Sequence, residues 1–165
     1  MTLFSPTTVG SFTLQNRLAL APMTRLRADE NGVPGDLVAE YYAQRAGIGL
    51  LVTEGVFPSA ESKAYPGQPG IATAAQAEGW ARVASAVQTA GGTVFMQLMH
   101  GGRVSHPGIT GTPRIVAPSA IAIEGQTRLA DGSKVDFPVP HALGTAELET
   151  VRDEFVAAAR RAVDA

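Results

Sequence analysis

The sequence predicts a mixed α/β protein with a parallel sheet, because short apolar runs alternate with amphipathic helical patterns. The runs lie at 18–21, 50–53 and 93–98 and are typical of strands covered on both faces. Such alternation requires right-handed crossovers between parallel strands. The turn after the first run, APMTRL, lacks the G-x-G-x-x-G pattern of an open dinucleotide-binding sheet, and no P-loop is present. The pattern therefore favours the first portion of a (β/α)8 barrel.

Residues 1–20 are expected to hold a short hairpin and the first strand. Segments 12–14 and 17–20 lie on either side of Gln15-Asn16, a pair typical of a turn. The first strand is expected to end before Pro22, because proline has no N–H to donate between central strands.

The next two helices have clear start signals. Asp36 is expected to cap the first of them, which ends near Gly47. Thr73 and Gln76 form a capping box at the start of the second, whose apolar stripe includes Trp80. A Gly-Gly pair ends this helix, and the third strand follows directly.

Residues 100–144 are rich in glycine and proline and are too long for an ordinary barrel connection. They are expected to form an excursion over the site with a small hairpin of its own. Thr145 is expected to cap the last helix, with Leu148 in its apolar stripe and arginines at 160–161 complementing its dipole. With only three strands, the chain 1–165 corresponds to an amino-terminal half of one barrel domain.

Composition removes several classes of function. The net charge of −2 and the scattered Lys and Arg argue against a nucleic-acid partner, which requires a concentrated basic face. The absence of cysteine excludes disulfides, thiolate metal sites, iron–sulfur clusters and a cysteine nucleophile within this chain. No signal peptide is visible, and the apolar runs are far shorter than the ~20 residues of a membrane span. We therefore expect a cytoplasmic protein with no membrane partner.

In parallel α/β proteins the site lies at the carboxyl ends of the strands. There this sequence places APMTR at 21–25, TEG at 53–55 and QLMHGGR at 97–103. Small residues, single hydroxyls and one amide, with few charges, suit a flat heteroaromatic ligand. Such a ligand would lie close to the backbone and be held by hydrogen bonds.

These motifs, in this order and spacing, resemble those of the Old Yellow Enzyme family. The resemblance continues in KAYPGQPGI at 63–71 and VAPSAI at 116–121, and it covers essentially the whole chain. It implies a TIM barrel that binds FMN and reduces activated C=C bonds of α,β-unsaturated carbonyl or nitro compounds, with NADPH or NADH as hydride donor. Thr24, where another subgroup carries Cys, and the PSAI segment favour the single-domain reductases over flavin barrels with an appended iron–sulfur domain.

By motif match, the resemblance implies that the strand ends hold the flavin ring. The backbone at Pro22 and Met23 would lie along the isoalloxazine ring, and the Thr24 hydroxyl would donate toward flavin O4. Gly55 would line the ring edge, and the Gln97 amide suits the pyrimidine part because it both donates and accepts. The implied cofactor-binding residues are Ala21, Pro22, Met23, Thr24, Gly55 and Gln97, and the implied substrate-binding residues are Thr24, Tyr65 and Met99.

The resemblance also indicates what this chain lacks. In the family, a His/Asn or His/His pair and a proton-donating Tyr come from the strand expected beyond Ala165, and the other half holds the FMN phosphate. No catalytic residue is therefore assigned here. The expected partners are a complementary carboxy-terminal half-barrel chain and small-molecule enones. Many relatives have Trp where this chain has Met99, which predicts a wider pocket.

Several conspicuous residues are better explained by structure than by chemistry. His100 and His106 lie on a loop with no carboxylate at ligand spacing, and His141 is remote from them, so no metal site is expected. Glu54 has no carboxylate partner and is expected to pair with an arginine. Arg103 is expected to tie its loop to strand-end carbonyls.

Two functional hypotheses of different classes follow. The first is half of an ene-reductase that is active only with a second chain. The second is a non-catalytic half-barrel that self-associates as a structural module without retained flavin, because an interrupted barrel exposes two strand edges and half of its core. The colour of the purified chain distinguishes them, since the second predicts a colourless protein.

Overall fold

The computed structural model describes residues 2–165, in which nine short strands and four α-helices are assigned. The helices are α1 (Asp36–Ala43), α2 (Ala74–Thr89), α3 (Pro107–Thr110) and α4 (Thr145–Asp164), with a 3-10 turn, η1 (Ala60–Ser62). The strands are β1 (Thr7–Val9), β2 (Phe12–Leu14), β3 (Ala19–Leu20), β4 (Leu50–Val56), β5 (Val94–Leu98), β6 (Val116–Ala117), β7 (Gln126–Arg128), β8 (Lys134–Asp136) and β9 (His141–Ala142).

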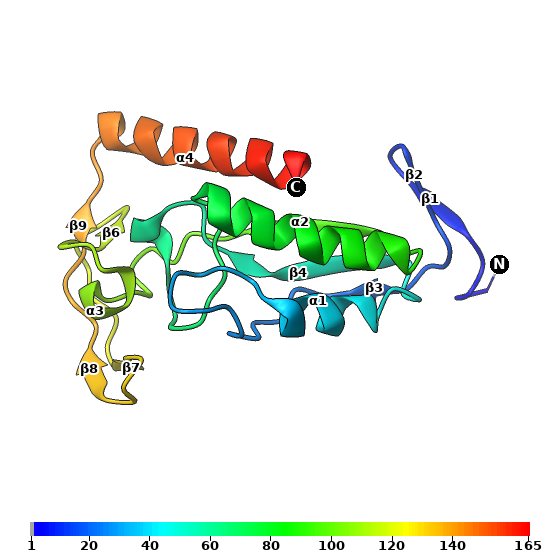
Figure 1. The fold of residues 1–165 in the computed structure, drawn as a ribbon. Helices are drawn as coiled ribbons and strands as arrows, with labels where there is room; N and C mark the ends of the chain where they lie inside the picture. Colours follow the sequence, from blue (N-terminus) through cyan, green and yellow to red (C-terminus); the bar gives the residue numbers. More distant parts are fainter. Residues whose placement is uncertain (1) are drawn as a thin grey trace.

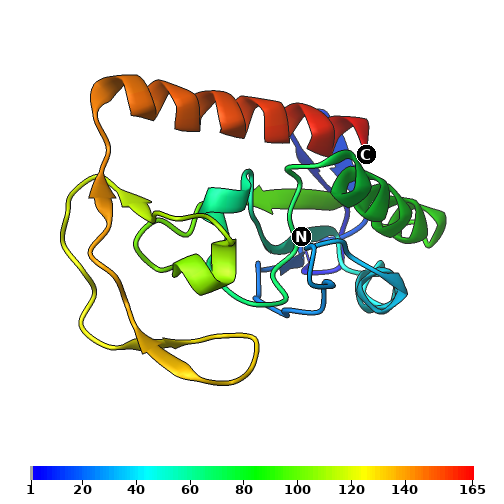
Figure 2. The same ribbon diagram turned by 60° about the vertical axis from the view of Figure 1, so that its left-hand side comes forward.

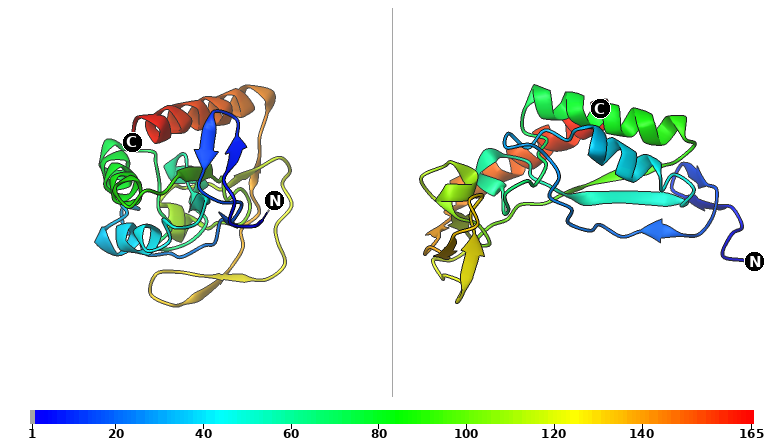
Figure 3. Two further views of the ribbon diagram at one scale, coloured as in Figure 1. Left: turned by 90° about the vertical axis from the view of Figure 1, so that its right-hand side faces the viewer. Right: turned by 60° about the horizontal axis from the view of Figure 1, so that its bottom comes forward.

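A three-stranded parallel sheet in the order β3-β4-β5 forms the centre of the molecule (Figure 1). Helices α1 and α2 lie on one side of this sheet (Figure 3), and α4 contacts α2 and β5 (Figure 2). The mixed α/β class with parallel strands is confirmed, but three strands leave the sheet open and no closed barrel exists within residues 2–165. No helix in this range has the length and apolarity needed to cross a membrane.

The main core lies between the sheet and the two covering helices. Leu51 and Trp80 are almost completely buried there, together with Tyr42 from α1. Burial alternates along the start of β4: Leu51 is buried, whereas Leu50 and Val52 on either side of it are only half-buried. The face of the sheet opposite to Leu51 is therefore less well covered there.

The capping box at the start of α2 is confirmed. The Thr73 hydroxyl accepts a hydrogen bond from the Gln76 N–H, and the Gln76 carboxamide oxygen accepts from the Thr73 N–H. The Trp80 indole N–H donates to the Gly70 carbonyl oxygen at 3.0 Å, which links this helix to the loop before it. Local sequence therefore determines the start of α2.

The predicted position of the amino-terminal hairpin is wrong. The antiparallel pair is β1 with β2, and β3 instead pairs in parallel with β4. Asn16 does not support a hairpin turn because its side-chain oxygen accepts from the N–H groups of Leu18 and Gly49. Phe12 of this hairpin packs edge-to-face on Phe95 of β5, with ring centroids 5.1 Å apart.

Two predicted helix caps are also wrong. Gly35 and Gly144 occupy the N-cap positions, and Asp36 and Thr145 are the first helical residues without side-chain capping bonds. At α4 the Glu147 carboxylate accepts from the Gly144 N–H at 2.9 Å and supplies the missing cap. Leu148, expected on the buried stripe of this helix, is 49% exposed.

Residues 100–144 extend beyond the carboxyl ends of the central strands as an irregular excursion (Figure 1). It contains the short helix α3, the parallel pair β6-β9 and the antiparallel hairpin β7-β8. The hairpin β7-β8 lies at the outer end of this excursion, while β6-β9 lies closer to the start of α4 (Figure 2).

Candidate functional site

The expected cofactor-binding residues come from the carboxyl ends of β3, β4 and β5, which meet at one edge of the parallel sheet. Gly55 and Gln97 are paired across β4 and β5. The four residues after β3 form an exposed stretch at this end of the sheet: Ala21, Pro22, Met23 and Thr24.

Gly55 allows close packing at this edge. A Cβ atom added to it would lie 2.7 Å from Sδ and 3.0 Å from Cβ of Met99, which is closer than side chains tolerate. The absence of a side chain at Gly55 thus lets Met99 lie directly against the backbone of β4. Two residues that the sequence assigned separately, to cofactor and to substrate, are therefore in mutual contact.

Glu54 holds the loop that follows β3. Its Oε2 accepts hydrogen bonds from the N–H groups of Arg25 at 2.8 Å and Leu26 at 3.0 Å. Its own N–H donates to the Tyr42 hydroxyl at 2.7 Å, and burial raises the pKa of Tyr42 above its ordinary range. The expected ion pair with an arginine is therefore wrong: Glu54 bonds to main-chain N–H groups, because its side chain is buried against this loop.

Gln68 connects the end of β4 to the loop that carries Tyr65. Its carboxamide N–H donates to the Gly55 carbonyl at 2.9 Å, and its oxygen accepts from the N–H groups of Ala64 and Tyr65 at 2.7 and 3.3 Å. The Gln68 side chain is buried. The loop bearing Tyr65 is thus held against β4.

Thr53 links β4 to β5 at the level of Gln97. Its hydroxyl oxygen accepts from the Gln97 N–H at 3.1 Å and donates to the Glu54 carbonyl at 2.9 Å. The Met99 N–H donates to the Val56 carbonyl and continues the pairing of the two strands. We call Tyr42, Thr53, Glu54 and Gln68 the strand-end network.

The Thr24 hydroxyl and the Gln97 carboxamide make no hydrogen bond to any residue within 2–165. Thr24 is exposed and Gln97 is half-buried, so both groups remain available to a ligand. A hydroxyl that donates and an amide that both donates and accepts match the polar edge of a flavin ring. This donor set at one sheet edge is compatible with FMN.

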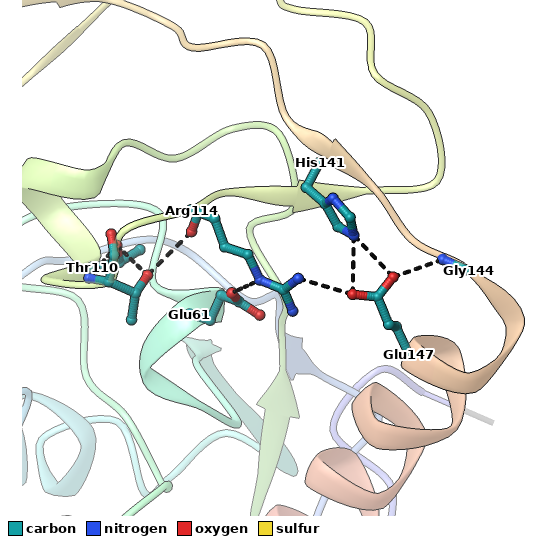
Figure 4. Close-up of polar contacts among 7 residues, drawn as sticks. Glu61, Thr110, Arg114, His141, Gly144 and Glu147 are labelled. Atoms are coloured by element: carbon teal, nitrogen blue, oxygen red, sulfur yellow. Dashed lines mark hydrogen bonds and ion pairs between the residues drawn. The ribbon is translucent and has the colours of Figure 1, made fainter.

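The excursion is attached by an exposed ionic cluster that joins it to η1 and α4 (Figure 4). The Arg114 guanidinium contacts Glu61 at 3.0 Å and Glu147 at 2.8 Å, and His141 Nε2 lies 2.9 Å from Glu147. Hydrogen bonds from Gly144, His141 and Arg114 lower the pKa of Glu147 to about 2. We call Glu61, Arg114, His141 and Glu147 the excursion clamp.

Each histidine has a local partner. Nδ1 of His100 accepts from the Gly102 N–H, and burial lowers the pKa of this ring, which stacks on Phe155. His106 caps α3 through Gly108. The part of the chain that the structure describes contains no group of three or more His, Asp or Glu side chains placed to hold a metal ion.

The partners of Arg103 differ from the expectation. Its guanidinium donates to the Ile121 carbonyl and the Ser119 hydroxyl, both at 2.8 Å, rather than to strand-end carbonyls. The excursion folds back over this arginine, so Arg103 links two parts of the excursion to each other.

Sequence reasoning missed the strand-end network itself. Gln68 lies in a Pro- and Gly-rich loop, where no pattern marks a buried amide. The Tyr42 ring packs in the core, as its place on an apolar helix stripe indicates, but its hydroxyl bonds to the Glu54 N–H, which no sequence pattern marks. The one available signal was Glu54, a charged residue inside an apolar strand.

Parallel strands joined through helices, with polar groups at their carboxyl ends, define an α/β protein, and (β/α)8 barrels carry their sites at the same ends of the strands. The model of the NADH:flavin oxidoreductase / NADH oxidase family matches residues 2–165. The chain belongs to this family.

Similar proteins support the same assignment. The chain is 42% identical to the flavin oxidoreductase hxnT of Emericella nidulans, over 99% of this chain and 43% of that protein. It is 36% identical to the "probable flavin mononucleotide-dependent alkene reductase" of Leishmania infantum, over 99% of this chain and 46% of that protein. The structure of an Old Yellow Enzyme homologue from Zymomonas mobilis superposes with a TM-score of 0.94 at 40% identity, over 99% of this chain and 45% of that one. The chain thus spans less than half the length of these relatives.

Proposed function

We propose that this chain is the flavin-cradling part of an FMN-dependent ene-reductase. The observation that carries the proposal is the pair of free polar groups, the Thr24 hydroxyl and the Gln97 carboxamide, at the strand ends of a chain in a flavin oxidoreductase family. The chemistry that FMN would supply when bound is hydride transfer from NADPH or NADH to one carbon of the activated C=C bond of an α,β-unsaturated carbonyl or nitro compound, the other carbon taking up a proton.

The residues of this chain would bind and orient the ring. The backbone of Ala21, Pro22 and Met23 would lie along it, and the Thr24 hydroxyl would donate toward O4, where negative charge increases on reduction. Gln97 would hydrogen-bond the pyrimidine portion, and Gly55 would allow close approach at the ring edge. Because Met99 packs against Gly55, the ring edge and the substrate rim formed by Met99 and Tyr65 would share one wall.

We further propose that the chain is the first portion of a (β/α)8 barrel and that a complementary carboxy-terminal half completes it. Open strand edges and one exposed apolar surface support this arrangement. The sheet ends at β3 on one side and at β5 on the other. A cavity of about 460 Å³ opens between α2, α4 and β5, and Phe95 and Val163 at its rim are 37% and 86% exposed. Apolar surface of this kind is covered in stable proteins.

A flavin titration with and without the complementary half of a family member tests this function. We expect a bound flavin spectrum and enone-dependent NAD(P)H oxidation with both halves present. Thr24→Ala and Gln97→Ala should each weaken flavin binding or lower turnover about tenfold or more, whereas Thr8→Ala in the distant hairpin should change neither. If the two halves together restored neither the flavin spectrum nor enone reduction, the proposal would be wrong.

A second candidate function is a non-catalytic half-barrel that self-associates without flavin. The exposed apolar surface at Phe95 and Val163 favours it as well, since a second copy can cover that surface. This candidate predicts a colourless oligomer in light scattering, unchanged by FMN. A yellow protein carrying one FMN per chain and oxidising NADPH without a second polypeptide would exclude it.

A further inference from the structure

The sheet does not set the conformation of the loop that carries Thr24. Pairing between β3 and β4 ends at Leu20 and Leu51, four positions before Thr24. Residues 21–24 are exposed and belong to no strand. The first firm attachment after β3 is the pair of hydrogen bonds from Arg25 and Leu26 to Glu54.

These two hydrogen bonds fix the orientation of the backbone at Arg25 and Leu26. One carboxylate oxygen accepts both N–H groups, at 2.8 and 3.0 Å, so two consecutive peptide units must turn toward the same atom. Leu26 has a φ of 57°, the only positive φ among the non-glycine residues of 2–165. An L-residue adopts this region at a cost, and it persists where surrounding bonds hold it. Glu54 provides those bonds.

Glu54 is itself firmly placed. Its side chain is 1% exposed, and its N–H is bound by the hydroxyl of the buried Tyr42. The second carboxylate oxygen, Oε1, is buried with no hydrogen-bond partner within residues 2–165. Burial of a carboxylate with one oxygen unpaired is unfavourable, so an apolar side chain would fill this position at lower free energy if packing were its only role. Its two hydrogen bonds to the loop are the interactions that distinguish it from an apolar residue.

We propose that Glu54 is a positioning residue: by holding the Arg25 and Leu26 N–H groups, it presents the Thr24 hydroxyl at the strand ends. The proposal rests on the proposed function for the role of Thr24 toward the flavin. The chain of contacts runs from Tyr42 on α1 through Glu54 on β4 to the loop. Helix packing thereby determines the placement of a ligand-binding hydroxyl.

Amide hydrogen exchange in the 165-residue chain tests the first half of the proposal without flavin. Glu54→Ala should speed exchange at Arg25 and Leu26 by about tenfold or more, because both N–H groups lose a charged acceptor. Glu54→Gln keeps an acceptor oxygen and should restore much of the protection. Glu40→Gln is the matched control. This exposed side chain lines a cavity together with Arg25 and Glu54, but its carboxylate bonds only to Gln44.

Unchanged exchange at Arg25 and Leu26 in Glu54→Ala would overturn the proposal. Equal acceleration throughout β4 and α1 would also overturn it, because it would show general loosening rather than loss of loop positioning. If Glu54→Ala fails to fold, Glu54→Met decides the matter, because it fills similar space without an acceptor oxygen. Exchange as fast as in an unstructured peptide at these two N–H groups, with the core still protected, supports positioning, and wild-type exchange rates refute it.

The flavin reduction potential of the assembled protein tests the second half. Thr24→Ala and Glu54→Ala should shift the potential in the same direction, toward a less stable reduced flavin, because the first removes the donor and the second misplaces it. The double variant should shift it no further than Thr24→Ala alone. Additive shifts would refute action through Thr24. Absence of flavin from the wild-type assembly would refute the proposed function instead, and the exchange result would still decide whether Glu54 holds the loop.

Discussion

The strand-end network and the excursion clamp hold neighbouring parts of the molecule by different means. In the strand-end network, buried side chains bond mainly to backbone groups, as Glu54 and Gln68 do. In the excursion clamp, charged side chains bond to one another at the surface, and Arg114 is 47% exposed. The first attaches loops to the sheet and the second attaches the excursion to η1 and α4, yet only the first removes its polar groups from water.

This difference sets how firmly each loop is held. Loss of a buried partner leaves a desolvated polar group and costs about 1–3 kcal/mol. Exposed ion pairs typically contribute about 0–1 kcal/mol and weaken with salt. The strand-end network is therefore expected to hold the loops that carry Thr24 and Tyr65 more firmly than the excursion clamp holds the excursion.

The largest effect is expected from Gln68→Ala. The change leaves the Gly55 carbonyl and the Ala64 and Tyr65 N–H groups without their buried partner, so the free energy of unfolding should fall by about 3 kcal/mol. Chemical denaturation measures it. Gln88→Ala, at an exposed position on α2, is the matched control and should change stability by no more than about 0.5 kcal/mol. Equal effects of the two variants would contradict the rigidity of this region.

Tyr42→Phe should have a smaller effect of about 1–2 kcal/mol, because the ring stays packed and only the acceptor for the Glu54 N–H is lost. The neighbouring Tyr41→Phe is the control, since the Tyr41 hydroxyl makes no hydrogen bond within residues 2–165. Thermal unfolding of the two variants side by side gives the comparison. A neutral Tyr42→Phe would mean that this hydroxyl contributes little to the strand-end network.

The smallest effect is expected in the excursion clamp and depends on pH. The folded-state pKa of Glu147 is lowered from 4.5 to about 2, so its contribution to stability is present above pH 4.5. The contribution should disappear as the pH falls through that interval. Glu147→Gln should remove this part of the acid dependence while keeping an acceptor for Gly144, and added salt should have a similar effect on the wild type. Acid titration of stability in wild type and variant provides the measurement.

Those features that depend on local sequence could be predicted. The capping box of Thr73 and Gln76 joins residues three apart, and the order of strands and helices follows from their patterns. Features set by distant contacts could not. Asn16 bonds to Gly47 and Gly49, more than thirty residues away, which displaced the predicted hairpin.

The same limit applies to the site. The motif match named the residues at the three strand ends, and the structure places them at one sheet edge. It gave no account of how they are held, because Gln68 reaches Gly55 and Glu54 reaches Arg25 only after the chain has folded. A side-chain amide in a glycine-rich loop and a lone acid in a strand have too many other uses to be interpreted from sequence.

The hairpin β1-β2 lies at the end of the sheet away from the excursion, where Phe12 packs on Phe95 (Figure 1). Its tip at Gly10 is open, with no atom within 4 Å of the place where a side chain would begin. A fluorophore or an affinity tag inserted at this tip would therefore be remote from the proposed flavin-binding edge. The hairpin is therefore a suitable attachment site for immobilising or labelling the protein while flavin and substrate binding are measured at the other end of the sheet.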